Sequence, residues 1–125
     1  MSTKHNIVVK AEPFFIGEKS SPEQKNYVFG YAITITNEGT IPAQLLHRHW
    51  LITDSNGKVQ EVQGDGVIGE QPYLKPGESF RYTSGAILET PVGIMQGHYT
   101  MRSDEGDKFK AVIPQFTLSI PRVLH

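Results

Sequence analysis

Large apolar side chains alternate with smaller or polar ones along much of this chain, and the alternation predicts β-strands. Over Tyr27–Asn37 the odd positions carry tyrosine, phenylalanine and isoleucine, whereas the even positions carry small or β-prone residues. A period of two residues places the large side chains on one face of a strand, against a core. The same reasoning predicts six further strands, which are Ile7–Ile16, Leu45–Asp54, Val59–Gln63, Ser79–Ile87, Ile94–Met101 and Phe109–Ile120.

The alternation reverses inside the last of these segments. Up to Ile113 the apolar residues occupy odd positions, and from Phe116 onward they occupy even ones, with Pro114 at the reversal. Because proline cannot donate a hydrogen bond to a neighbouring strand, we predict a bulge or a switch between sheets there.

Turn residues separate the predicted strands. Asn56-Gly57 favours a tight hairpin, and Lys75-Pro76-Gly77-Glu78 suits a type II turn. Glu18–Asn26 is polar and predicts a loop, and no segment has the apolar spacing of an α-helix. We therefore predict an all-β fold for residues 1–125 as a single domain: an immunoglobulin-like or fibronectin type III-like antiparallel sandwich of about seven strands.

The strand with the only tryptophan places its side chains in two groups. If Leu46, Trp50 and Ile52 face the core, Arg48 has the same parity and needs its aliphatic stem buried and its charged head at an edge or paired. His47 and His49 then point to the opposite face.

Charge and cysteine content narrow the classes of partner. The formal net charge is −1 and no basic run is present, so we expect no nucleic-acid partner. Cysteine is absent, which excludes disulfides, a thiolate nucleophile and cysteine-ligated metal. No apolar run approaches the ~20 residues that span a bilayer, and the N-terminal residues do not read as a signal peptide. We expect no membrane insertion and a cytoplasmic location.

Several motifs occur in the order typical of one known family, and these are Arg48–Asp54, Gly64–Pro72, Lys75–Glu78, Tyr82–Gly85 and Gly93–Tyr99. Over nearly its whole length the chain resembles the ApaG family. The resemblance implies a fibronectin type III-like sandwich and an association with cobalt and magnesium efflux or resistance. Similar domains in a eukaryotic F-box ubiquitin-ligase subunit and in a DNA-polymerase-interacting protein imply a protein-binding role. The resemblance implies no catalytic residues.

Gly64-x-Gly66-x-x-Gly69 has the spacing of the dinucleotide-binding fingerprint. That fingerprint needs a helix after the glycines, whereas Pro72 follows here without any helical pattern. We interpret the segment as a glycine-rich crossing between sheets, where the backbone needs positive φ or a close approach. An alternative remains open, in which backbone amides form an anion-binding nest. Pyrophosphate or a nucleotide would then bind at a site made by Gly64, Asp65, Gly66, Gly69 and Arg48, or with Lys75 adding the charge.

Histidines supply a second candidate site. His47 and His49 are two residues apart on a predicted strand, a spacing that suits cobalt, nickel or zinc, and His98 on a neighbouring strand would add a third ligand. Magnesium would prefer carboxylates, for which the candidates are Asp54, Glu61, Asp65 and Glu70. Because histidines and acids are common on surfaces, we predict no bound metal and no cofactor.

The sequence offers no constellation for catalysis. It has no Gly-x-Ser-x-Gly elbow, no cysteine and no singular pair of carboxylates, so we expect no enzyme activity. The leading hypothesis is a module that binds an unidentified protein partner through the polar face of Leu45–Asp54 and the Gly64–Gln71 loop, with His49, Glu70 and Gln71 on that surface. The alternative is a small-anion or divalent-metal binder that uses the glycine loop or the histidine face.

Overall fold

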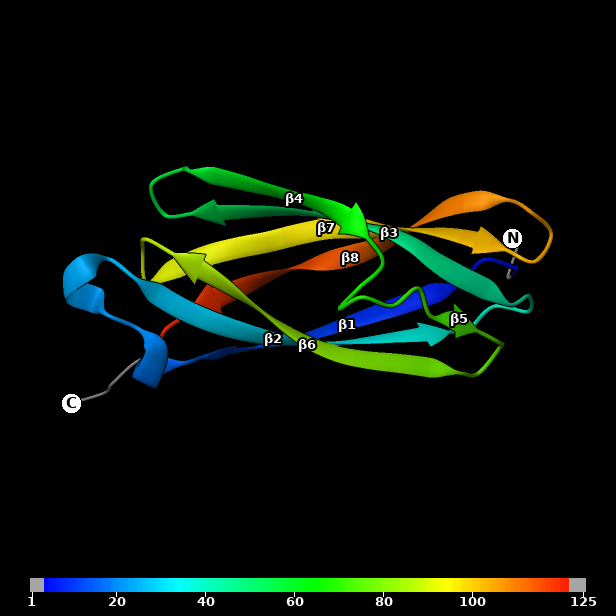
Figure 1. Cartoon of the computed structure of the whole chain (residues 1–125), viewed down its shortest axis with the longest axis horizontal. Coiled ribbons are helices and arrows are strands. Elements are labelled where there is room, and N and C mark those ends of the chain that lie inside the picture. The colour runs from blue at the N-terminus through cyan, green and yellow to red at the C-terminus, as the bar shows by residue number, and fades with distance from the viewer. Residues whose placement is uncertain (1–3, 122–125) are drawn as a thin grey trace.

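The computed structural model describes residues 4–121, which form a sandwich of two antiparallel sheets (Figure 1). One sheet has the order β1-β2-β6, from β1 (Ile7–Phe15), β2 (Tyr27–Asn37) and β6 (Ser79–Leu88). The other has the order β4-β3-β7-β8, from β3 (Ala43–Asp54), β4 (Val59–Asp65), β7 (Val92–Ser103) and β8 (Lys108–Ser119). β5 (Tyr73–Leu74) pairs with the beginning of β3. The predicted all-β sandwich is confirmed.

Every predicted strand is present, and its ends lie within two residues of the predicted ones. β5 was not predicted, because two residues are too short to show an alternation. The predicted loop Glu18–Asn26 includes most of η1 (Gly17–Lys19) and all of η2 (Pro22–Gln24), which are short 3-10 helices. Within residues 4–121 there is no α-helix, and no helix there is long and apolar enough to cross a membrane.

The core lies between the two sheets and consists of the side chains that the alternation placed inward. On β2, Phe29, Ile33 and Ile35 are at most 1% exposed. Trp50 of β3 packs against Tyr31 of β2, with ring centroids 5.4 Å apart. Burial of these apolar faces drives the two sheets together, and it fixes which residues of each strand remain outside.

Two bulges adjust which side chains face the core. In the β7–β8 pairing Met95 lies opposite Phe116 and Gly97 lies opposite Ile113, so β8 has one extra residue at Pro114. The bulge predicted from the parity reversal is confirmed. A second irregularity lies between Leu45 and His47 of β3, where Leu45 and Leu46 are both buried.

The two long sides of the sandwich differ. On one side β1 packs against β8. On the other side the edge strands are β4 and β6, which are bridged by a hydrogen bond from Gln60 Nε2 to the Ile87 carbonyl (3.2 Å) and by the ion pair of Lys58 with Glu89. The connection from β4 to β5 passes along this second side (Figure 1). The candidate site lies next to that connection.

Asn37 holds the end of β2 to the strands that follow. Its side chain is fully buried, and Nδ2 donates to the carbonyls of Ile41 (3.0 Å) and Leu74 (2.9 Å). Oδ1 accepts from the amide of Gly39 at 2.9 Å. All three bonds join backbone groups that would otherwise lack partners in a turn.

We predict that Asn37→Ala lowers the free energy of unfolding by about 2–4 kcal/mol, because it leaves buried carbonyls and an amide unpaired. Urea unfolding followed by tryptophan fluorescence measures the change. Asn26→Ala is the matched control, since the Asn26 side chain makes no hydrogen bond within residues 4–121. Equal stability of the two variants would contradict the role given to Asn37.

Candidate functional site

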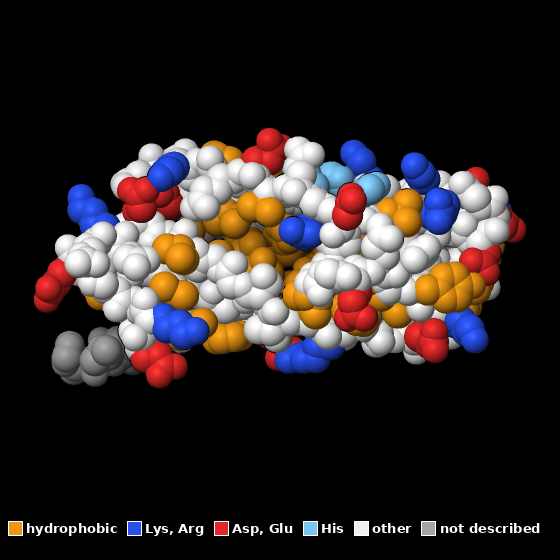
Figure 2. All heavy atoms as spheres, in the orientation of Figure 1, with side chains coloured by type: hydrophobic (Ala, Val, Ile, Leu, Met, Phe, Trp, Pro, Cys, Tyr) orange, Lys and Arg blue, Asp and Glu red, His pale blue; other side chains and the backbone are white. Residues whose placement is uncertain are grey.

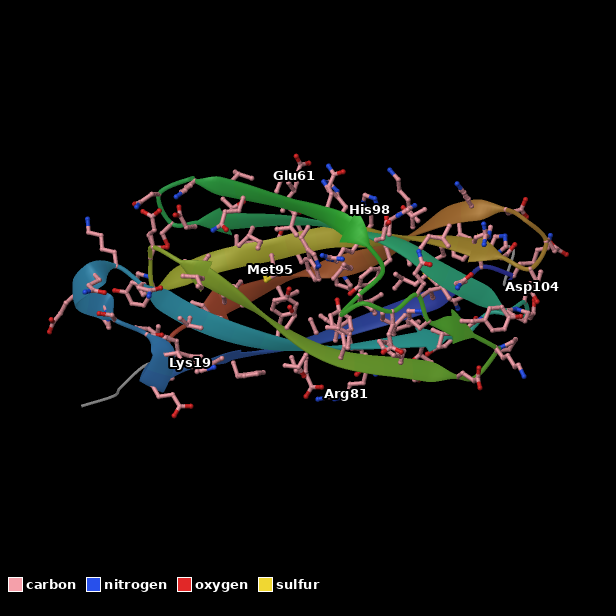
Figure 3. All side chains as sticks on the ribbon, viewed as in Figure 1. Lys19, Glu61, Arg81, Met95, His98 and Asp104 are labelled. Atoms are coloured by element: carbon pink, nitrogen blue, oxygen red, sulfur yellow. The ribbon has the colours of Figure 1, made fainter. Side chains whose placement is uncertain are left out.

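A shallow polar hollow of about 580 Å³ lies on the outer face of β3, β4 and β7. His47 and His49 of β3, His98 of β7, and Glu61 and Asp65 of β4 contribute to its lining. Histidine and acidic side chains gather near the end of β4 in Figure 2. Glu61 and His98 both project from this sheet away from the other one, whereas Met95 lies between the sheets (Figure 3). The sequence hypothesis that His47 and His49 face outward is confirmed.

Each of the two histidines on β3 contacts a carboxylate of β4. His47 Nδ1 lies 2.8 Å from Asp65 Oδ1, its direct partner across the two strands. His49 Nε2 lies 2.7 Å from Glu61 Oε2. The hydrogen bond from His49, followed by one from Gln63, lowers the pKa of the Glu61 carboxyl below its ordinary value. Glu61 is therefore an anion at neutral pH, and it holds the His49 ring.

His98 lies directly opposite His49 in the β3–β7 pairing, and the centroids of the two rings are 5.1 Å apart. Burial lowers the pKa of the His98 imidazole below its ordinary value, and the nearby charges of Lys110 and His49 act in the same direction. His98 is therefore neutral at pH 7.

The structure does not bring the three histidines together as one set of metal ligands. Within residues 4–121 no group of three or more histidine or acidic side chains is placed to hold a metal ion. The structure brings His49 and His98 together, but His47 is turned toward Asp65. Among the carboxylates considered for magnesium, Asp54 is a buried turn former, because its Oδ1 accepts from the amides of Asn56 (2.8 Å) and Lys58 (2.9 Å).

Arg48 points to the inner side of the same strand and reaches across Gly64 to the edge. Its Nη1 donates to the carbonyls of Asp65 (3.1 Å) and Gly66 (3.0 Å). A Cβ atom at Gly64 would lie 2.8 Å from the guanidinium, so a side chain there would force the Arg48 head to shift. The predicted placement of the Arg48 head at an edge is confirmed. Its guanidinium binds the start of the glycine loop.

Three backbone amides of the glycine loop, those of residues 66, 67 and 70, donate to carbonyls of the protein. Gly66 N donates to the Leu46 carbonyl at 2.8 Å, and Val67 and Glu70 exchange two backbone hydrogen bonds of 2.8 and 2.9 Å. An anion-binding nest needs free, convergent amides. The amides of residues 66, 67 and 70 are not free, so this geometry does not favour a pyrophosphate or nucleotide site.

The loop is also not a crossing between sheets. β4 and β5 both pair with β3 along the same edge, and the chain changes sheets only later, in the turn Lys75–Glu78 between β5 and β6. The expected backbone features are present, since φ is +64° at Gly66 and +80° at Gly69. The loop is therefore an excursion from one edge, and it returns at Pro72, whose carbonyl accepts from the Leu45 amide at 2.9 Å.

The predicted surface residues of the loop differ in their contacts. Gln71 Nε2 donates to the Leu46 carbonyl at 3.0 Å, and its own carbonyl accepts from Gln44, so Gln71 fastens the loop to β3. The carboxylate of Glu70 is exposed and has no ion-pair partner within residues 4–121. Of these two residues, Glu70 is the one whose side chain is free to meet a partner.

Sequence reasoning missed Gln63, Thr100 and Ile68 at this surface. Gln63 lines the hollow beside Glu61, and Thr100 has the same parity as His98 on β7. The β3–β4 hairpin has a three-residue loop, residues 55–57, closed between Asp54 and Lys58, and this register places Asp65 opposite His47. A two-residue turn at Asn56-Gly57 would have placed Gly66 there, so the turn motif alone did not predict the His47–Asp65 pair.

The three glycines of the fingerprint predict three different responses to alanine. Gly66→Ala should lower the free energy of unfolding most, by more than about 3 kcal/mol, because a Cβ there lies 2.1 Å from the Glu70 carbonyl oxygen and φ is positive. Gly64→Ala should cost about 1–2 kcal/mol by displacing Arg48 from its carbonyls. Gly69→Ala meets open space and should cost about 1–2 kcal/mol for its positive φ. Thermal unfolding gives the order, and a largest loss at Gly69 would contradict this assignment.

The lowered pKa of His98 predicts a pH dependence of stability. The folded state binds the proton less readily than the unfolded chain. This contribution to stability is therefore complete above the ordinary pKa of about 6.5 and is lost as the pH falls through the folded-state value. Between about pH 7.5 and about pH 5.5, the free energy of unfolding of the wild type should fall by more than that of His98→Gln. Urea unfolding at each pH measures the two decreases. An NMR titration in which His98 has a pKa above 6.5 would refute the sign.

Comparisons with known proteins show which family the chain resembles. Residues 17–103 match the family model described as "ApaG domain". The chain is 57% identical over 124 residues to Protein ApaG of Aromatoleum aromaticum, covering 99% of this chain and 98% of that one. It is 56% identical over 122 residues to Protein ApaG of Thiobacillus denitrificans, covering 98% of this chain and 96% of that one.

Solved structures show the same architecture. The structure of the putative ApaA protein from Bordetella pertussis superposes with a TM-score of 0.95 at 46% identity, covering 98% of this chain and all of that one. A protein from Archaeoglobus fulgidus, at 14% identity and a TM-score of 0.54 over 93% of this chain and 98% of that one, shares the fold alone. By sequence over nearly its full length and by fold, this chain belongs to the ApaG family.

Proposed function

We propose that this domain is a non-enzymatic module that binds another protein through the outer face of β3, β4 and β7 and the adjoining glycine loop. The observation that carries the proposal is the grouping of His47–Asp65, His49–Glu61 and His98 on one exposed sheet face. Exposed ion pairs contribute little to folding, so stability alone gives no reason to collect them there. A face of oriented donors and acceptors suits recognition.

The shape of the hollow supports a protein rather than a small molecule. Small-molecule sites are enclosed and mostly apolar. This hollow is shallow, and polar side chains of three adjacent strands line it. A protein surface fits such a face without needing depth.

The absence of catalysis is part of the proposal. A histidine that activates a nucleophile must reach a hydroxyl or thiol. Here the hydrogen-bonding partners of His47 and His49 are carboxylates. Neither ring has a serine or threonine hydroxyl as a hydrogen-bond partner within residues 4–121.

The family association with cobalt and magnesium efflux is compatible with this role. A partner protein that transports or senses cations would connect the domain to efflux without a metal ion bound to this chain. No contact within residues 4–121 favours the alternative of direct metal or anion binding.

A photoreactive amino acid placed at Gln63 should crosslink to a discrete partner protein in cells. Gln63 is exposed on β4 at the proposed face, and Thr83 of β6 is an exposed control position on the opposite sheet. We expect a crosslinked band from position 63 that is absent at position 83 and weaker when His49→Gln is added. Identical crosslinking from both faces, or none from position 63, would contradict the proposal.

A further inference from the structure

The tip of the glycine loop is a tight turn with an unsuitable residue at its centre. Val67 and Glu70 exchange backbone hydrogen bonds of 2.8 and 2.9 Å around Ile68 and Gly69. Both central residues have positive φ, +43° at Ile68 and +80° at Gly69, as in a type I′ turn. Asparagine, aspartate or glycine normally occupies the first central position.

Isoleucine in this conformation is strained because its branched Cβ lies against its own backbone. The cost is not offset by burial, since Ile68 is 57% exposed and is not among the side chains packed on the core. Within residues 4–121 the only other non-glycine residue with positive φ is Lys25, which is not β-branched. Backbone strain that is not offset by packing of the side chain suggests that the side chain has a function.

The base of the turn is held in place on all sides. Val67 is fully buried in the core. Gly66 is bound to the Leu46 carbonyl through its amide and to Arg48 through its own carbonyl. Gln71 adds a bond to the Leu46 carbonyl. The turn therefore presents Ile68 from a fixed base, and a preorganised side chain loses little conformational entropy on binding.

The charges beside the tip define the other half of the contact. Glu70 closes the turn, and its exposed carboxylate has no ion pair within residues 4–121. Asp65, at the other end of the loop, contacts His47, and its side chain is 82% exposed. An aliphatic tip flanked by carboxylates complements an apolar pocket with a basic rim.

We propose that Ile68 is an interaction anchor, which inserts into an apolar pocket of a partner protein while a lysine or arginine of that partner meets Glu70. This inference rests on the proposed protein-binding function and adds to it the part of the surface that enters the partner. The strained turn holds the Ile68 side chain, before binding, in the position in which it enters the partner's pocket.

The first test separates strain from a folding role. Ile68→Asn places a residue that tolerates positive φ in the turn, so the midpoint of thermal unfolding should rise by roughly 2–6 °C. Ile87→Asn is the matched control, because Ile87 of β6 is 57% exposed on the opposite sheet and has no positive φ, and its midpoint should not rise. A lower midpoint for Ile68→Asn would show that the isoleucine stabilises the fold, and the proposal would fall.

The second test measures binding by the folded variants. A photoreactive amino acid at position 68 should crosslink a partner in cells, which is then identified, purified and titrated with each variant by calorimetry. We expect Ile68→Asn to weaken binding at least tenfold, Ile87→Asn to leave it unchanged, and Glu70→Gln to weaken it and reduce its salt dependence.

The outcomes distinguish the two levels of the proposal. Crosslinks from Gln63 without any from position 68, or equal affinity of wild type and Ile68→Asn, would remove the anchor and leave the protein-binding function standing. Crosslinks from neither position would remove both.

Discussion

The pleat of β3 is the constraint on which this site depends. Successive residues of a strand point to opposite faces, so a strand that buries Trp50 and Ile52 between the sheets must present His49 outside. The neighbours then follow from the register, which places Asp65 opposite His47 and His98 opposite His49. A shift of one residue would exchange the faces, burying the histidines and exposing the tryptophan. Core packing and the outer polar face are therefore two consequences of the same alternation.

Arg48 shows how one side chain connects the core to the loop. It shares the inner face of β3 with Trp50, and its head passes over Gly64, which has no side chain in that path. Its bonds to the Asp65 and Gly66 carbonyls fix the direction in which the chain leaves β4. The loop that follows is consequently ordered by β3, through Leu46 and Arg48, rather than by a ligand.

Much of the fold was predictable because alternate residues of a strand face the core, so the apolar alternation in the sequence identifies the buried face. The inner face of β2, the bulge at Pro114 and the positive φ of Gly77 all followed from local patterns. β5 was not predictable, since two residues show no period. The path of the glycine loop was also missed, because it is set by contacts with β3 that are distant in sequence.

The candidate site was predicted only in part, and the reason is physical. Parity places His47 and His49 on one face, but it does not tell whether a carboxylate or a metal will meet them. That choice depends on side-chain reach across strands, as in the 2.7 Å contact of His49 with Glu61. Likewise, the glycines at positions 66 and 69 allow positive φ to be predicted, whereas the positive φ of Ile68 is found only in the structure of the loop.

The central claim is that the outer face of β3, β4 and β7, with its loop, is where this domain meets another protein. Hydrogen exchange of the domain, alone and saturated with its purified partner, tests this claim most directly. We expect slower exchange of backbone amides in residues 61–70 and 96–100 and unchanged exchange in β1, β2 and β6. Slower exchange confined to β1, β2 and β6 would show that the partner binds the opposite sheet.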